Sequence, residues 1–189
     1  AFLRERGLTG SKEVCGEGEC GACAVVGVAP DSDGQSVYQT VNSCLVLLPS
    51  VADAELYTVE GVARNGALHP VQQALVDQGG SQCGYCTPGF VMSMFSEYYR
   101  KGRAGYDADA VSGNLCRCTG YRPIRDALAQ LGAPATSDDV FCARLDRPPP
   151  VVGALALTSE RGDYVRPTDL DAALAYLGDH PEAKVIAGG

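Results

Sequence analysis

Two hydrophobic patterns follow one another along the chain. Residues 24–28 form a short apolar run and residues 36–41 an alternating one, with turn residues 30–34 between them, which predicts a β-hairpin. From residue 68 to residue 132 apolar side chains recur at helical spacing, over 71–76 and 90–95, and a third helix is predicted from Pro123 to Leu131. The sequence therefore predicts a β-rich unit over residues 1–62 and a small helical unit over residues 63–134.

Beyond the helical unit, residues 135–163 are rich in Pro, Ala, Ser and Asp and include the consecutive prolines 148–150, which predicts an extended linker. Residues 168–177 then predict an N-capped amphipathic helix, and residues 183–189 predict a strand that runs into a glycine turn. We assign residues 164–189 to the beginning of a further domain. Because the hairpin lacks earlier strands to cover its apolar face, and the last motif stops half-way, we expect more chain at both ends.

Composition narrows the class of protein. The chain has 189 residues, 46% of them hydrophobic, and a formal net charge of −8 from 23 acidic and 15 basic residues. Because there is no run of Lys or Arg, we expect no binding to nucleic acid or to an acidic membrane face. No apolar stretch approaches the length of a membrane-spanning helix, and the first residues lack the apolar segment of a secretory signal. We therefore expect a soluble, cytoplasmic protein.

The chain contains nine cysteines, which is too many for ordinary core packing in a cytoplasmic protein and indicates metal binding before disulfides. The odd number agrees, since complete pairing would leave one thiol over. Eight of the nine fall into two quartets, and Cys142 stands alone in the predicted linker. A lone cysteine is usually a packed or exposed thiol, so we do not expect Cys142 to be a ligand.

The first quartet has the spacing of plant-type ferredoxins. Cys15, Cys20 and Cys23 form a C-x4-C-x2-C loop, and Cys44 follows the hairpin. Three thiolates from one short loop converge only if the backbone visits positive φ, which glycine does at low cost. The loop glycines are Gly16, Gly18 and Gly21. Zinc sites are usually built from C-x2-4-C pairs and fit this loop poorly, so we predict a [2Fe–2S] cluster here.

The second quartet consists of two short pairs, each placed where a helix is predicted to begin: Cys83 with Cys86, and Cys116 with Cys118. Unpaired N–H groups at a helix start favour thiolates and an anionic cluster. A structural zinc site and a redox disulfide are open alternatives on these pairs alone. His69 and His180 lie outside both motifs, which argues against a Rieske centre, and His69 is expected to be structural at a helix start.

Four segments of the chain together resemble the molybdenum hydroxylase family. They are LTGSKE at 8–13, CGEGECGAC at 15–23, QCGYCTPG at 82–89 and GNLCRCTGY at 113–121. The resemblance implies an α+β chain in which a ferredoxin-like domain and a helical domain of four-helix-bundle type each hold one [2Fe–2S] cluster. It also implies that Gln82 contacts the pterin of a molybdenum cofactor and that Cys118 lies nearby. Electrons would then reach the second cluster first.

The tail is similar to the beginning of the flavin domain of xanthine dehydrogenases, where a strand and a glycine-rich turn approach FAD. On pattern alone a strand that ends in two glycines is usually a plain turn, so the FAD assignment depends on the resemblance. The residues that this assigns to FAD binding are Val185, Ile186, Ala187, Gly188 and Gly189.

The resemblance implies an electron-transfer subunit of an oxidoreductase of the xanthine dehydrogenase type, in a hetero-oligomer with a molybdenum-binding large subunit. Hypoxanthine or xanthine would be hydroxylated at molybdopterin on that partner, with electrons passing through two clusters to FAD and NAD. No catalytic residue is therefore expected in this chain. Two alternatives stay open: an iron–sulfur subunit of an aldehyde or other N-heterocycle oxidoreductase, and a non-catalytic zinc-binding assembly module.

Overall fold

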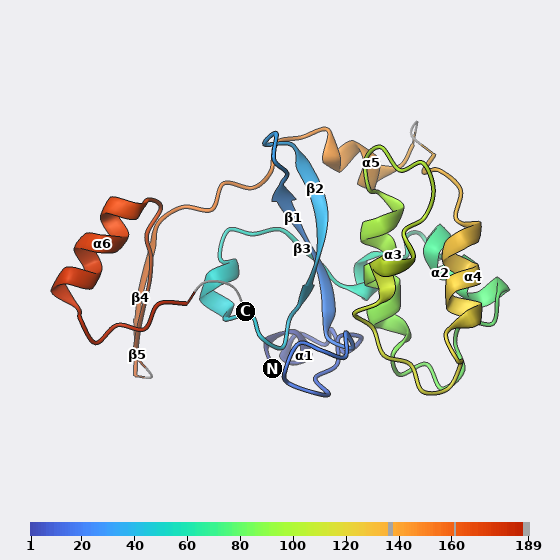
Figure 1. Ribbon diagram of the computed structural model, residues 1–189, viewed down its shortest axis with the longest axis horizontal. Coiled ribbons are helices and arrows are strands. Elements are labelled where there is room, and N and C mark those ends of the chain that lie inside the picture. Colours follow the sequence, from blue (N-terminus) through green and yellow to red (C-terminus); the bar gives the residue numbers. More distant parts are fainter. Residues whose placement is uncertain (136–137, 161, 187–189) are drawn as a thin grey trace.

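The computed structural model describes residues 1–135, 138–160 and 162–186. Figure 1 shows three parts side by side: a small sheet with its loops in the middle, a group of helices on one side, and a hairpin with one helix on the other. The chain is of the mixed α and β class, and the strands of the middle part precede the group of helices on its side.

The middle part is a three-stranded antiparallel sheet in the order β2-β1-β3. Its elements are α1 (Phe2–Glu5), β1 (Ala24–Pro30), β2 (Ser36–Asn42), the 3-10 turn η1 (Leu48–Val51), β3 (Leu56–Tyr57) and the 3-10 turn η2 (Val59–Gly61). In the central strand Val26 faces Thr40 on one side and Tyr57 on the other. The predicted hairpin is confirmed, and its Val-rich strand is buried because a helix covers it.

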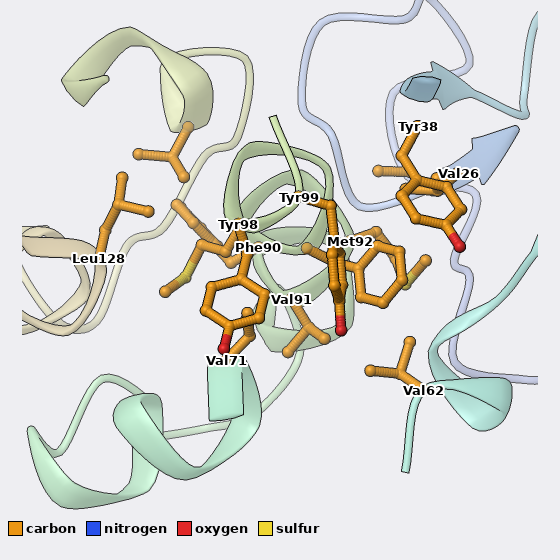
Figure 2. Close-up of a cluster of buried hydrophobic side chains, with 14 of the residues drawn as sticks. Val26, Tyr38, Val62, Val71, Phe90, Val91, Met92, Tyr98, Tyr99 and Leu128 are labelled. Atoms are coloured by element: carbon orange, nitrogen blue, oxygen red, sulfur yellow. The ribbon is translucent and has the colours of Figure 1, made fainter. Parts of the chain in front are cut away.

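The helical part has α3 at its centre. Its elements are α2 (Pro70–Asp77), α3 (Thr87–Tyr98), the 3-10 turn η3 (Ala108–Val111) and α4 (Arg122–Gln130). The three predicted helices are therefore confirmed. In Figure 2 the side chains of α3 lie between Val26 and Tyr38 of the sheet and Leu128 of α4, with Val71 of α2 below them. One hydrophobic core thus runs through both parts.

The range that the sequence analysis expected as a linker contains a helix, α5 (Val140–Leu145), and a strand, β4 (Leu155–Ser159). Asp139 caps α5, because its Oδ1 accepts from the backbone N–H of Phe141 at 2.8 Å. Phe141 is buried against the aromatic side chains of the core, and the Arg144 guanidinium bonds Glu55 Oε2 at 2.7 Å. This helix has only six residues, so the composition of the surrounding Pro-, Ala-, Ser- and Asp-rich stretch did not predict it. Residues 148–154, which include the proline run, have no regular secondary structure, as expected for a linker.

The third part is an antiparallel hairpin of β4 with β5 (Gly162–Arg166), followed by α6 (Leu170–Asp179). The predicted N-capped helix is confirmed, since Asp169 Oδ1 accepts from the N–H of Ala172 at 2.8 Å. The predicted strand over 183–186 is wrong: these residues are irregular, because no described strand lies beside them to pair with. Ala187, Gly188 and Gly189 lie outside the described residues. Among the helices described, none has the length and apolarity that crossing a membrane requires.

His69 is structural, as predicted. Its ring Nδ1 accepts from the backbone N–H of Val71 at 3.2 Å and so caps α2, while the backbone N–H of His69 donates to Gln72 Oε1. The Nε2 atom lies 2.8 Å from the hydroxyl of Tyr99, which donates to Asp139 Oδ2. Because Nδ1 accepts, the neutral ring carries its proton on Nε2. Burial lowers the pKa of His69 to about 4, against a smaller opposing effect of Asp139.

A histidine that is buried in its neutral form makes stability depend on pH. The unfolded chain binds more protons than the native chain between the ordinary pKa of 6.5 and about 4, so stability is full above this window and falls as the pH decreases through it. We expect a loss of roughly 2 kcal/mol between about pH 7.5 and about pH 5 in urea unfolding. His69→Asn keeps an N-cap acceptor and removes the titration, so its profile should be flatter. Equal slopes in the two proteins would contradict this account of His69.

Two candidate metal centres

The first quartet is carried by a wrapped loop between α1 and β1. The three loop glycines have φ values of 70°, 75° and 66°, at Gly16, Gly18 and Gly21, which confirms that the loop needs positive φ. Cys23 is buried at the start of β1, and Cys44 follows the end of β2, so the hairpin returns the fourth thiol to the loop.

Polar side chains hold this loop to the sheet. The carbonyl of Cys23 accepts from Ser11 Oγ at 3.0 Å and from Ser43 Oγ at 2.7 Å, and Asn42 Nδ2 donates to the carbonyl of Gly18. The sequence analysis assigned no role to these side chains. Serine and asparagine beside cysteines carry no distinctive spacing, so only the folded chain identifies them.

The second quartet joins the start of α3 to the loop before α4. Cys86 is the N-cap residue of α3, as predicted, and Cys118 Sγ donates to Cys83 Sγ at 3.4 Å. The N–H of Cys116 donates to the hydroxyl of Tyr121, the first residue before α4, at 2.9 Å. Tyr121 has φ of 67°, so the loop turns sharply before the helix begins. The two predicted pairs therefore meet.

Each quartet contains two hydrogen-bonded thiol pairs: Cys15 with Cys20, Cys23 with Cys44, Cys83 with Cys118, and Cys86 with Cys116. The pairs of one quartet also interact with each other, Cys23 with Cys20 and Cys83 with Cys116. Within the described ranges no three His, Cys, Asp or Glu side chains converge closely enough for a single metal ion. A tetrahedral zinc ion needs four sulfurs at about 2.3 Å from one point. In a [2Fe–2S] cluster each iron takes two thiolates, so two pairs fit that group better.

The thiols differ in how readily they ionise. Hydrogen bonds, first from the backbone of Glu17, lower the pKa of Cys15 to about 6. Burial raises the pKa of Cys23, and likewise that of Cys86, to about 11. The backbone N–H of Tyr85 lowers the pKa of Cys83. Because metals bind thiolates, each quartet offers one thiol that ionises easily and one whose higher pKa means that the metal must deprotonate it.

The two cysteine loops contact each other directly. The N–H of Leu115 donates to the carbonyl of Cys20 at 3.0 Å, and Asn114 Nδ2 donates to the carbonyl of Gly21 at 3.2 Å. A Cβ atom on Gly21 would overlap the Asn114 amide, and one on Gly89 would overlap the Gly21 carbonyl. Bare backbone at both glycines is therefore required for this approach. Asn114, only 3% exposed, is a positioning residue that the sequence analysis did not identify.

The remaining predicted site residues lie apart from this contact. Gln82 is exposed directly before Cys83, and Val185 and Ile186 are exposed in irregular chain. Cys142 is half-buried on α5 against the core, away from both quartets, as expected for a packed thiol. The pterin and FAD assignments stay predictions.

Comparison with known proteins identifies an iron–sulfur domain in the chain. The profile of a family described as "[2Fe-2S] binding domain" matches residues 58–129. Over 147 residues, 75% of this chain, it is 46% identical to xanthine dehydrogenase 1 of Arabidopsis thaliana. The chain spans 11% of the length of that relative.

Two solved structures resemble the chain in fold and sequence. Quinoline 2-oxidoreductase from Pseudomonas putida 86 is 34% identical with a TM-score of 0.58, and the match covers 68% of this chain and 75% of that one. Aldehyde oxidoreductase from Desulfovibrio gigas is 38% identical with a TM-score of 0.57, covering 69% of this chain and 14% of that one.

Gly89→Ala tests the contact between the loops. The added methyl overlaps backbone of the first cysteine loop, which cannot move without displacing Cys20 and Cys23, so we expect a loss of about 1–3 kcal/mol in stability. Iron content should fall at both quartets. The matched control is Gly113→Ala, where a Cβ meets nothing within 4 Å. A Gly89→Ala protein with the melting temperature and iron content of the control would contradict the required close approach.

Proposed function

This chain belongs to the molybdenum hydroxylase family, and from that premise we propose that it is the electron-carrying part of such an oxidoreductase, with one [2Fe–2S] cluster held by each cysteine quartet. The observation that carries the proposal is the arrangement of eight cysteines as two quartets of thiol pairs whose loops touch at Leu115 and Cys20. When bound, such clusters supply one-electron carriage without making or breaking substrate bonds.

At the first quartet, the residues of this chain would bind the cluster and exclude water from it. Gly16, Gly18 and Gly21 turn the backbone so that its N–H groups approach the thiols, as that of Glu17 approaches Cys15 Sγ at 3.5 Å. Hydrogen bonds to sulfur favour the added negative charge of a reduced cluster. Cys23 is buried, so solvent is excluded from its side of the site.

At the second quartet, short local bonds orient the ligands. The N–H of Thr119 donates to Cys116 Sγ at 3.5 Å, and the Thr119 hydroxyl lies 3.1 Å from the same sulfur. Burial opposes ionisation of Cys116, but these bonds outweigh it and lower the pKa of that thiol. Cys83 and Cys118 are exposed beside Gln82, which supports this side as the proposed contact with molybdopterin on a partner subunit.

The proposed direction of electron flow is from that molybdopterin, past the second quartet and then the first, to FAD and NAD. The hydrogen bond from Leu115, next to Cys116, to the carbonyl of Cys20 supports direct transfer between the two clusters, because it gives a short bonded path between the quartets. We also propose the finer domain assignment: ferredoxin-like over 1–62, four-helix-bundle type over 63–134, a connecting segment over 135–163 that includes α5 and β4, and the beginning of an FAD-binding domain over 164–189. The helices α2, α3 and α4 with η3 support the second of these.

The proposed substrate of the whole enzyme is a purine, hypoxanthine or xanthine, because the xanthine dehydrogenase of Arabidopsis thaliana is 46% identical over most of this chain. A second candidate is an aldehyde or another N-heterocycle, favoured by the likeness to quinoline 2-oxidoreductase and aldehyde oxidoreductase. In each case the proposed partner is a molybdenum-binding subunit or segment, where the chemistry takes place.

Metal analysis of cysteine variants tests the two-cluster proposal. We expect a brown protein with about four iron and about four acid-labile sulfide per chain. Cys44→Ser should remove the first pair of irons and Cys86→Ser the second, each variant retaining about half of the iron. The matched control, Cys142→Ser, should keep all of it, because Cys142 lies outside both quartets. Zinc without iron or sulfide would reject electron carriage in favour of the assembly module.

Turnover by the holoenzyme tests the substrate proposal. Purified with its molybdenum-binding partner, the protein should reduce NAD with hypoxanthine or xanthine and leave simple aldehydes and quinoline largely unreacted. Activity confined to aldehydes or quinoline would reject the purine assignment and leave the two-cluster proposal intact.

A further inference from the structure

A single arginine of the C-terminal hairpin is bonded to the middle part of the molecule. The guanidinium of Arg166, at the end of β5, donates from Nη1 to the carbonyls of Pro49, Ser50 and Ala52 at 3.2–3.3 Å. Its Nη2 donates to Asp53 Oδ2 at 3.2 Å. Only 14% of the Arg166 side chain is exposed. These contacts join residues more than a hundred positions apart in sequence, which a chance surface encounter of a flexible tail does not explain.

The oxygen atoms that accept these hydrogen bonds lie where one planar guanidinium group can reach all of them. Pro49 and Ser50 lie within the short 3-10 turn η1, and Ala52 directly follows it. The carbonyl of Pro49 also accepts from the N–H of Ala52 at 3.2 Å. Asp53, with φ of 66°, reverses the chain so that its carboxylate lies beside those carbonyls. Arginine presents several donors in one plane, whereas lysine offers a compact point charge. Pro49, the first of these acceptors, is the fifth residue after Cys44, the last thiol of the first quartet.

A second arginine holds the same stretch of chain from another side. The Arg144 guanidinium, on α5, bonds Glu55 at 2.7 Å and lies 3.3 Å from Ser36 Oγ. The Nε of Arg166 also donates to the carbonyl of Gly153, at 2.9 Å. The extended run between α5 and β4 is thus held at both ends. Arg144 holds its beginning to Glu55, and Arg166, which bonds Asp53, holds its end through Gly153. Figure 1 shows this run crossing from α5 to the hairpin, with η1 between the sheet and the hairpin.

We propose that Arg166 is a positioning residue that docks the C-terminal hairpin onto residues 49–53 and so fixes the distance between the following unit and the first cysteine quartet. The docking itself depends only on the contacts above. It deepens the proposed function in one respect: if residues 164–189 begin the FAD-binding domain, Arg166 sets how closely the electron acceptor approaches Cys44. Arg144 anchors the preceding chain, and Arg166 supplies the contact that orients the hairpin.

Hydrogen–deuterium exchange on the full-length protein, purified with its metal, tests the docking. Arg166→Gln should increase exchange about tenfold in two separate peptides, 45–57 and 155–166, a ratio that corresponds to about 1.4 kcal/mol of lost docking. Peptides from β2 and α3 should exchange as in wild type. Arg166→Lys should restore protection only in part, because an ammonium reaches Asp53 but not all three carbonyls. The matched control, Lys184→Gln, removes an exposed charge of the same tail and should change nothing.

The outcomes separate this proposal from the two-cluster proposal. Unchanged exchange in 45–57 on Arg166→Gln, or full rescue by lysine, would overturn the docking role even when the iron content is as expected. Loss of protection in both peptides supports it whatever metal the quartets hold. Iron content should be the same in wild type, Arg166→Gln and Lys184→Gln, and a protein without iron in all three would reject the cluster assignment alone.

Discussion

The close approach of the two cysteine loops is the constraint on which the rest of the structure depends. Backbone of the first loop, at Gly21, lies against Gly89 in the first turn of α3 and beneath the amide of Asn114. A side chain at either glycine would separate the loops, and the hydrogen bond from Leu115 to Cys20 would be lost. Because these residues alternate with the cysteines in sequence, the contact brings the two quartets together.

The same helix that makes this contact also builds the core. The start of α3 carries Cys86 as its N-cap residue and Gly89 one turn later, and its middle buries Phe90, Met92 and Phe95 between the sheet and the other helices. Packing therefore determines where the second quartet lies relative to the first. Rigid placement of this kind suits the electron carriage that we propose for the two quartets.

Much of the site could be predicted from the sequence, because cysteine spacing and loop glycines express a local geometric need. The positive φ values of Gly16, Gly18 and Gly21 and the N-cap position of Cys86 follow from that need. Asn114 could not be found in this way, since its role comes from a contact with a loop more than ninety residues earlier. The hydrogen bonds of Ser11 and Asn42 to the first loop are hidden for the same reason.

Elements with a strong hydrophobic periodicity could be predicted from the sequence. Elements whose formation depends on tertiary contacts could not. Three helices and the hairpin of the first two units follow from hydrophobic spacing. In contrast, α5 forms because Asp139 caps it and Phe141 packs against aromatic side chains of the core. The strand expected over 183–186 has the right residues but no neighbour among the described strands. Strand pairing is a property of two segments, so one segment's composition cannot establish it.

The central claim is that two two-iron centres lie side by side, joined through the contact of their loops. Low-temperature electron paramagnetic resonance of the fully dithionite-reduced protein measures this most directly. The account predicts two distinct signals of equal intensity, each split or broadened by the other because the centres are adjacent. A single signal, or two signals with no mutual interaction, would contradict it.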